Sequence, residues 1–186
     1  RQLDDRGAEF PRLDDRLVGY KNRFGYAVRL NRDERGADQP WTTVIKYDRT
    51  GGSSVAHDFG DGQFPSEPVF VPRTDGAAED DGFVLCVVHD GPGDGSYVAV
   101  LDARDLAGPA LASCHLHRRI PIGFHGNFAA GLVLPGRWAG GPPLSGISAS
   151  RLDLRCVAVL YGACRKGPQP TRCASVCGGL PLTVRS

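Results

Sequence analysis

Short runs of β-branched and aromatic residues recur along the first 130 residues, and turn-forming residues close each run. Such runs between turn signals are typical of β-strands. The pattern predicts strands at residues 42–47, 54–59, 69–71, 82–88, 97–102, 110–116 and 120–124. Strands about 12 residues apart are typical of sandwiches, barrels and propellers, and helical periodicity is almost absent. We therefore expect an all-β fold.

The run at residues 82–88 differs from the others because almost every position is apolar. A strand that is apolar on both of its alternating faces is expected to be buried on both. A loop rich in Gly, Asp and Pro follows at residues 90–95, and a second apolar run begins at Tyr97. The two runs are predicted to form a hairpin in the core.

The composition changes sharply after Ala130. Residues 1–130 hold 20 acidic and 15 basic side chains, whereas residues 131–186 hold one acid, Asp153, and seven bases. The second segment also contains four of the six cysteines, with no CxxC pair among them, so a zinc site is not indicated and their pairing stays open. We expect residues 131–186 to be an irregular Gly/Pro/Cys-rich tail, disordered or a gene-model artefact, with one strand at residues 156–161.

Overall charge excludes one class of partner. The chain carries 22 basic and 21 acidic side chains, so it lacks the positive surplus with which nucleic-acid-binding proteins neutralise phosphates. No apolar run reaches membrane-spanning length, and the N-terminal residues lack the apolar stretch of a signal peptide. No GxSxG, P-loop, HExxH or GxGxxG motif is present. We expect a soluble or peripheral protein that does not bind nucleic acid.

Four of the five histidines have simple structural interpretations. His115 and His117 share one face of a predicted strand and could chelate a metal, but an exposed polar strand end is the favoured interpretation. His57 and His89 each precede an aspartate at a strand end, where a surface turn explains them.

The fifth histidine, His125, lies in the apolar, glycine-containing segment 121–128. A neutral imidazole in such a setting is a good metal ligand, although a hydrogen-bonded core histidine is the favoured interpretation of the segment alone. Glu67 stands between two prolines before a buried strand, and a metal-bound histidine that donates its second N–H would satisfy a buried carboxylate there. A turn residue facing water is the alternative for Glu67, and the same question arises for Glu9.

An ordered set of segments resembles the carotenoid cleavage oxygenases, in family order and at family-like spacing over residues 1 to about 130. Within that family, the segments are most similar to the bacterial and algal apocarotenoid or lignostilbene-type branch. The matching segments are Glu9–Asp14, Arg23–Tyr26, Ile45–Asp48, Pro65–Arg73, Glu79–Gly82, Leu101–Ala103 and Phe124–Gly126.

This resemblance implies the C-terminal blades of a seven-bladed β-propeller with a non-haem Fe(II) held by four histidines. Such enzymes use O₂ to cleave a double bond of an apolar polyene or stilbene, and peripheral contact with a membrane is one expectation for this protein. His125 matches the last iron ligand. Glu9 and Glu67 match glutamates that hydrogen-bond ligand histidines, and we pair Glu67 with His125. A cytoplasmic location is expected, or a plastid in a photosynthetic eukaryote.

The resemblance covers only the C-terminal part of such an enzyme, without the other three iron ligands. We therefore expect the chain to be a fragment that has no activity by itself. Two alternatives stay open. One is a non-catalytic propeller module that binds a partner. The other is a small secreted domain held by disulfides, against which the missing signal segment argues.

Overall fold

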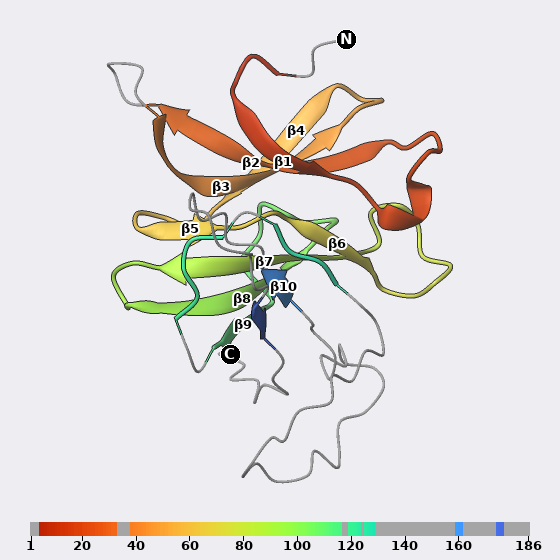
Figure 1. The fold of residues 1–186 in the computed structure, drawn as a ribbon. Coiled ribbons are helices and arrows are strands. Elements are labelled where there is room, and N and C mark those ends of the chain that lie inside the picture. Colours follow the sequence, from red (N-terminus) through yellow and green to blue (C-terminus); the bar gives the residue numbers. More distant parts are fainter. Residues whose placement is uncertain are drawn as a thin grey trace, which may run out of the picture.

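The computed structural model describes residues 4–32, 38–116, 119–123 and 125–128, together with two short strands at 159–161 and 174–176. Two antiparallel sheets follow one another along the chain and stack face to face (Figure 1). The first sheet has the strand order β1-β2-β3-β4, and in the second β5 and β6 both pair with β7, which is followed by β8 and β9. The predicted all-β fold is confirmed.

The first sheet consists of β1 (Ala8–Arg12), β2 (Phe24–Arg32), β3 (Asp38–Asp48) and β4 (Ser53–Asp58). The second consists of β5 (Gln63–Pro65), β6 (Val69–Pro72), β7 (Gly82–Asp90), β8 (Gly95–Asp102) and β9 (Ala112–His115). One turn of 3-10 helix, η1 (Asp15–Leu17), joins β1 to β2, and the carboxylate of Asp14 caps it by accepting the backbone N–H of Arg16. Among the described residues, no helix is long and apolar enough to cross a membrane.

Strand β7 lies between two apolar layers. Every residue from Gly82 to Val88 is buried, so the prediction of a strand buried on both faces is confirmed. One face contributes to the core between the two sheets, and the other forms a second apolar cluster with side chains of β8, β9 and the segment after β9. The first layer includes Tyr26, Val28, Val44, Val84, Cys86 and Val88. The second includes Phe83, Leu85, Val87, Val98, Cys114 and Ile120.

Polar contacts from the loop before β7 hold the two sheets together. The carboxylate of Glu79 accepts the backbone N–H groups of Arg23 and Phe24, at 2.5 and 2.7 Å. The buried ammonium of Lys46 donates to Asp80 Oδ2 at 2.9 Å and lies 4.1 Å from the centre of the Phe24 ring. Because a buried ammonium needs partners of this kind, the acidic loop serves to join the sheets.

The sequence prediction fails in two respects within the described residues. Strands β1, β2 and β5 were not predicted, and residues 120–123 do not form the expected strand. There the backbone N–H of Ile120 donates to Ser96 Oγ at 2.9 Å, and its carbonyl accepts from the same hydroxyl at 3.1 Å. Since Pro121 has no N–H, side-chain hydrogen bonds replace a strand ladder.

In the last third of the chain the structure describes two short strands, β10 (Val159–Tyr161) and β11 (Ala174–Val176), which pair antiparallel. Strand β10 lies within the predicted strand at 156–161. The prediction of an irregular tail otherwise lies outside the described residues.

Candidate functional site

The candidate site forms where three segments meet: strand β1, the connection between β5 and β6, and residues 125–128. The connection is held in place by Ser66. Its backbone N–H donates to the carbonyl of Val87 at 2.8 Å, and its hydroxyl accepts the N–H of Val87 at 3.1 Å. Prolines on either side restrict the backbone, so Ser66 fixes the connection to β7 and sets the position of the next residue, Glu67.

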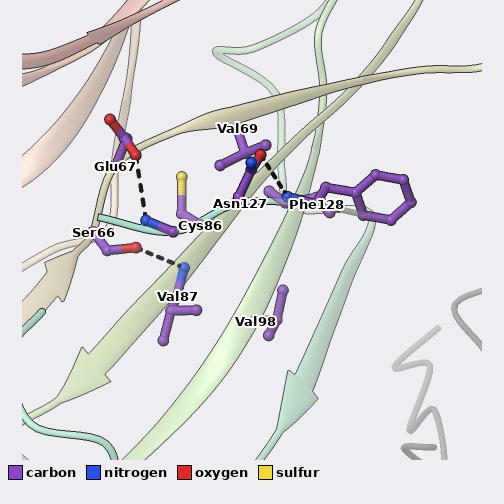
Figure 2. Close-up of a pocket in the computed structure, with 10 residues that line it drawn as sticks. Ser66, Glu67, Val69, Cys86, Val87, Val98, Asn127 and Phe128 are labelled. Atoms are coloured by element: carbon purple, nitrogen blue, oxygen red, sulfur yellow. Dashed lines mark hydrogen bonds between the residues drawn. The ribbon is translucent and has the colours of Figure 1, made fainter. Parts of the chain in front are cut away.

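Glu67 is buried, with only 8% of its side chain exposed. Its Oε2 atom accepts from Arg12 Nη1 at 3.0 Å. The same oxygen accepts the backbone N–H of Gly126 at 3.3 Å (Figure 2). Its Oε1 atom lies 3.5 Å from Nδ1 of His125. A turn residue facing water, the alternative interpretation of Glu67, is therefore wrong.

The imidazole of His125 lies on the exposed side of this carboxylate. Its side chain is 68% exposed, so the interpretation as a core histidine is wrong as well. The ring meets Phe10 edge to face, with 5.3 Å between the ring centres, and among the described residues Nε2 has no hydrogen bond. A carboxylate at Nδ1 favours the tautomer with the proton on Nδ1, which leaves the lone pair of Nε2 available to a metal ion.

A bulge in β1 brings two of its side chains to this site. Glu9 pairs with Val28 and Arg12 with Tyr26, so an advance of three residues along β1 corresponds to two residues along β2. Phe10 adopts the left-handed conformation, with φ of 54°, as a bulged residue can. Phe10 then contacts His125, and Arg12 reaches Glu67.

The structure does not bring Glu9 to the Glu67–His125 pair. Glu9 is exposed on β1, and its carboxylate makes no hydrogen bond or ion pair with any described residue. Its role beside a different ligand histidine stays a prediction. Arg12, in contrast, is a residue of the site that the sequence did not indicate, because its partner Glu67 lies 55 positions away and no local motif links them.

The other histidines have structural contacts or face solvent. His57 and His89 are partly buried in strands, not in surface turns, and their Nδ1 atoms lie 3.1 Å from the Gly108 carbonyl and 3.2 Å from the Ile120 carbonyl. His115 is exposed at the end of β9, and His117 lies outside the described residues. No group of three or more His, Cys, Asp or Glu in the described part of the chain could hold a metal ion.

A cavity of about 20 Å³ lies beneath residues 126–128 (Figure 2). It is lined mainly by apolar side chains, including Val69, Val98 and Cys86. Burial raises the pKa of the Cys86 thiol, so this cysteine is an unreactive core residue. A volume near that of one water molecule is too small for an organic substrate.

Comparison with known proteins gives one consistent family. Residues 1–130 match the model of the family described as retinal pigment epithelial membrane protein. The chain is 35% identical over 124 residues to the apocarotenoid-15,15′-oxygenase of Synechocystis. It is 38% identical over 128 residues to the carotenoid cleavage oxygenase of Mycobacterium tuberculosis. With the carotenoid 9,10(9′,10′)-cleavage dioxygenase 1 of Phaseolus vulgaris it shares 32% identity over 143 residues.

These alignments cover 67%, 68% and 69% of this chain, in that order, but only 25% of each relative, so the chain spans about a quarter of their length. Among solved structures, cobalt-substituted Synechocystis apocarotenoid oxygenase matches with a TM-score of 0.63 and 32% identity, over 69% of this chain and 26% of that one. The two sheets are thus part of a β-propeller whose ring they do not close, and the predicted partial propeller is confirmed.

Proposed function

The chain belongs to the carotenoid cleavage oxygenase family, and from this premise we propose that it is the C-terminal part of a non-haem Fe(II) dioxygenase. Such an enzyme would cleave a double bond of a carotenoid, apocarotenoid or stilbene-type substrate with O₂. His125 would be one of its iron ligands.

The observation that supports this proposal most directly is the pairing of Glu67 with His125. The buried carboxylate lies 3.5 Å from Nδ1 of an imidazole whose ring is largely exposed and whose Nε2 has no hydrogen bond among the described residues. Carboxylates that accept the second N–H of a ligand histidine fix its tautomer and raise its basicity. A neutral imidazole also suits Fe(II) among the divalent metals. His125 and Glu67 therefore fit one ligand of an iron site and the carboxylate that orients this ligand.

Bound Fe(II) would supply the oxygen-activating redox chemistry that amino-acid side chains lack. Within this chain, His125 would donate one ligand, Glu67 would hold the proton on Nδ1, and the Phe10 ring would limit rotation of the imidazole. No group of three or more possible ligands occurs among the described residues, so we place the other ligands in the part of a family-length protein that this chain does not span. We expect no cleavage by this chain alone.

The relatives' names differ in the bond that is cleaved, so the substrate class is proposed only as an apolar polyene or stilbene. Its delivery from a membrane surface, in the cytoplasm or in a plastid, belongs to the same proposal.

The test is replacement of His125 by Ala in a family-length protein that contains this segment. We expect iron content, measured by elemental analysis, and cleavage products, measured by chromatography, to fall to background. His115→Ala is the matched control, because His115 is exposed at the end of β9, and it should leave both unchanged. Undiminished turnover in His125→Ala would overturn the proposal, and a folded but iron-free parent protein would favour a non-catalytic binding module.

A further inference from the structure

We propose that Arg12 is a positioning residue, which orients the imidazole of His125 through the carboxylate of Glu67 and the backbone at Gly126. This inference rests on the proposed function, because the orientation of His125 matters for chemistry only if its ring binds a metal.

Arg12 joins the three segments of the site. Its side chain is 19% exposed, and Nη1 donates to Glu67 Oε2 at 3.0 Å and to the carbonyl of Gly126 at 3.3 Å. Nη2 lies 3.5 Å from Asn127 Oδ1. One guanidinium group therefore fixes both the carboxylate that faces the His125 ring and the backbone that carries this ring.

The two oxygens of Glu67 have different partners. Oε2 accepts from Arg12 and from the Gly126 N–H, and Oε1 faces Nδ1 of His125. Without Arg12, the backbone N–H of Gly126 at 3.3 Å would be the one remaining partner of Oε2 among the described residues, and the carboxylate could then rotate away from the imidazole. The fork of the guanidinium suits this role because its nitrogens lie in one plane at fixed angles, unlike the single ammonium of a lysine.

Asp15 in turn holds Arg12. Its two carboxylate oxygens accept from Nη2 at 3.0 and 3.1 Å, which fixes the rotation of the guanidinium and directs Nη1 toward Glu67. Asp15 is 57% exposed, so its contribution should be the weaker one.

The experiment measures the tautomer of the neutral His125 ring by ¹⁵N NMR of the imidazole nitrogens in the full chain without metal, at alkaline pH. His125→Gln assigns the signals. We expect the parent to favour the proton on Nδ1 and Arg12→Met to lower the ratio of Nδ1–H to Nε2–H about fivefold, as the loss of a hydrogen bond of ordinary net strength would. Arg12→Lys should restore part of this ratio, and Asp15→Asn should lower it less than Arg12→Met does.

Arg73→Met is the matched control. Arg73 directly follows β6, is half-exposed, pairs with Asp81 and does not contact the site. It should leave the His125 ratio unchanged. An unchanged ratio in Arg12→Met with a preserved amide spectrum would overturn the inference. If Arg12→Met does not fold, Asp15→Asn and Arg12→Lys decide, and parental ratios in both would overturn it.

Failure of this inference and failure of the proposed function are distinguishable. The tautomer ratio is read without metal, whereas the proposed function is tested by the iron content of His125→Ala in a family-length protein.

Discussion

Strand β7 and the segment at residues 120–128 are both rich in apolar residues, but they differ in the contacts that hold them in place. Strand β7 pairs with three other strands of the second sheet and is buried on both faces. Ile120 is held by the hydroxyl of Ser96, and residues 125–126 by the carboxylate of Glu67. Apolar side chains and backbone ladders thus build the sheet, whereas a few buried polar side chains place the site on it.

The largest expected effect is the loss of apolar packing in the sheets. Leu101 on β8 is 1% exposed and belongs to the core between the two sheets, so Leu101→Ala should lower the free energy of unfolding by about 3 kcal/mol. Leu111 is 50% exposed, and Leu111→Ala should change it by less than about 0.5 kcal/mol. Denaturant unfolding followed by circular dichroism measures both. Equal effects would show that the two sheets do not share a packed core.

The second-largest expected effect on stability is the loss of the polar contacts made by Glu67. Glu67→Gln removes the charge that Arg12 and the N–H of Gly126 bind, and should cost about 2 kcal/mol, as the loss of hydrogen bonds to a charged group does. Glu9→Gln, at an exposed position, should be nearly neutral. The same unfolding measurement compares the two variants. A neutral Glu67→Gln would mean that the carboxylate does not organise residues 125–128.

This contrast explains what the sequence could predict. The hairpin of β7 and β8 was predictable because its apolar pattern and its Gly/Asp/Pro loop are local signals. Strand β2 was missed although Tyr26 and Val28, both buried, alternate along it in a way that could have indicated a strand. The sequence of strand β1 gives a weaker strand signal, because Pro11 and the bulge at Phe10 interrupt its alternation.

The site was predictable only in part. The resemblance directed attention to His125 and Glu67, which lie 58 positions apart and which no periodicity connects. The exposure of His125 was not foreseen, because apolar neighbours in the sequence suggested a buried ring. Arg12 depends on a bulge and on a partner 55 positions away, and neither can be read from the residues around it.

A smaller effect should follow from Ser96→Ala. The Ser96 hydroxyl is buried and bonds both backbone groups of Ile120, so its loss should cost about 1 kcal/mol and speed hydrogen exchange of the Ile120 amide. Amide exchange followed by NMR measures this locally. Ser53→Ala on the exposed strand β4 is the control. Unchanged protection of Ile120 in Ser96→Ala would show that apolar contacts alone hold residues 119–123.

The smallest expected effect is a dependence on pH that arises far from both regions. Asp48 accepts from the Arg23 guanidinium and from the backbone N–H groups of Gly51 and Thr50, which holds the pKa of its carboxyl well below the ordinary value. A carboxyl whose pKa is lower in the folded state stabilises the fold above its unfolded pKa, near 3.9, and this stabilisation is lost as the pH falls toward the folded pKa. Asp48→Asn should therefore flatten the stability profile below about pH 4.

The profile is measured by thermal unfolding between about pH 2 and pH 7, which spans the ordinary titration range of carboxyl groups. Asp61→Asn, in the exposed turn before β5, should keep the slope of the parent and serves as the control. A slope in Asp48→Asn equal to that of the parent would mean that the contacts with Arg23 and the turn at Thr50 and Gly51 contribute nothing in solution. A flatter slope would show that even an exposed turn of the first sheet is fixed by a charged side chain, as residues 125–128 are fixed by Glu67.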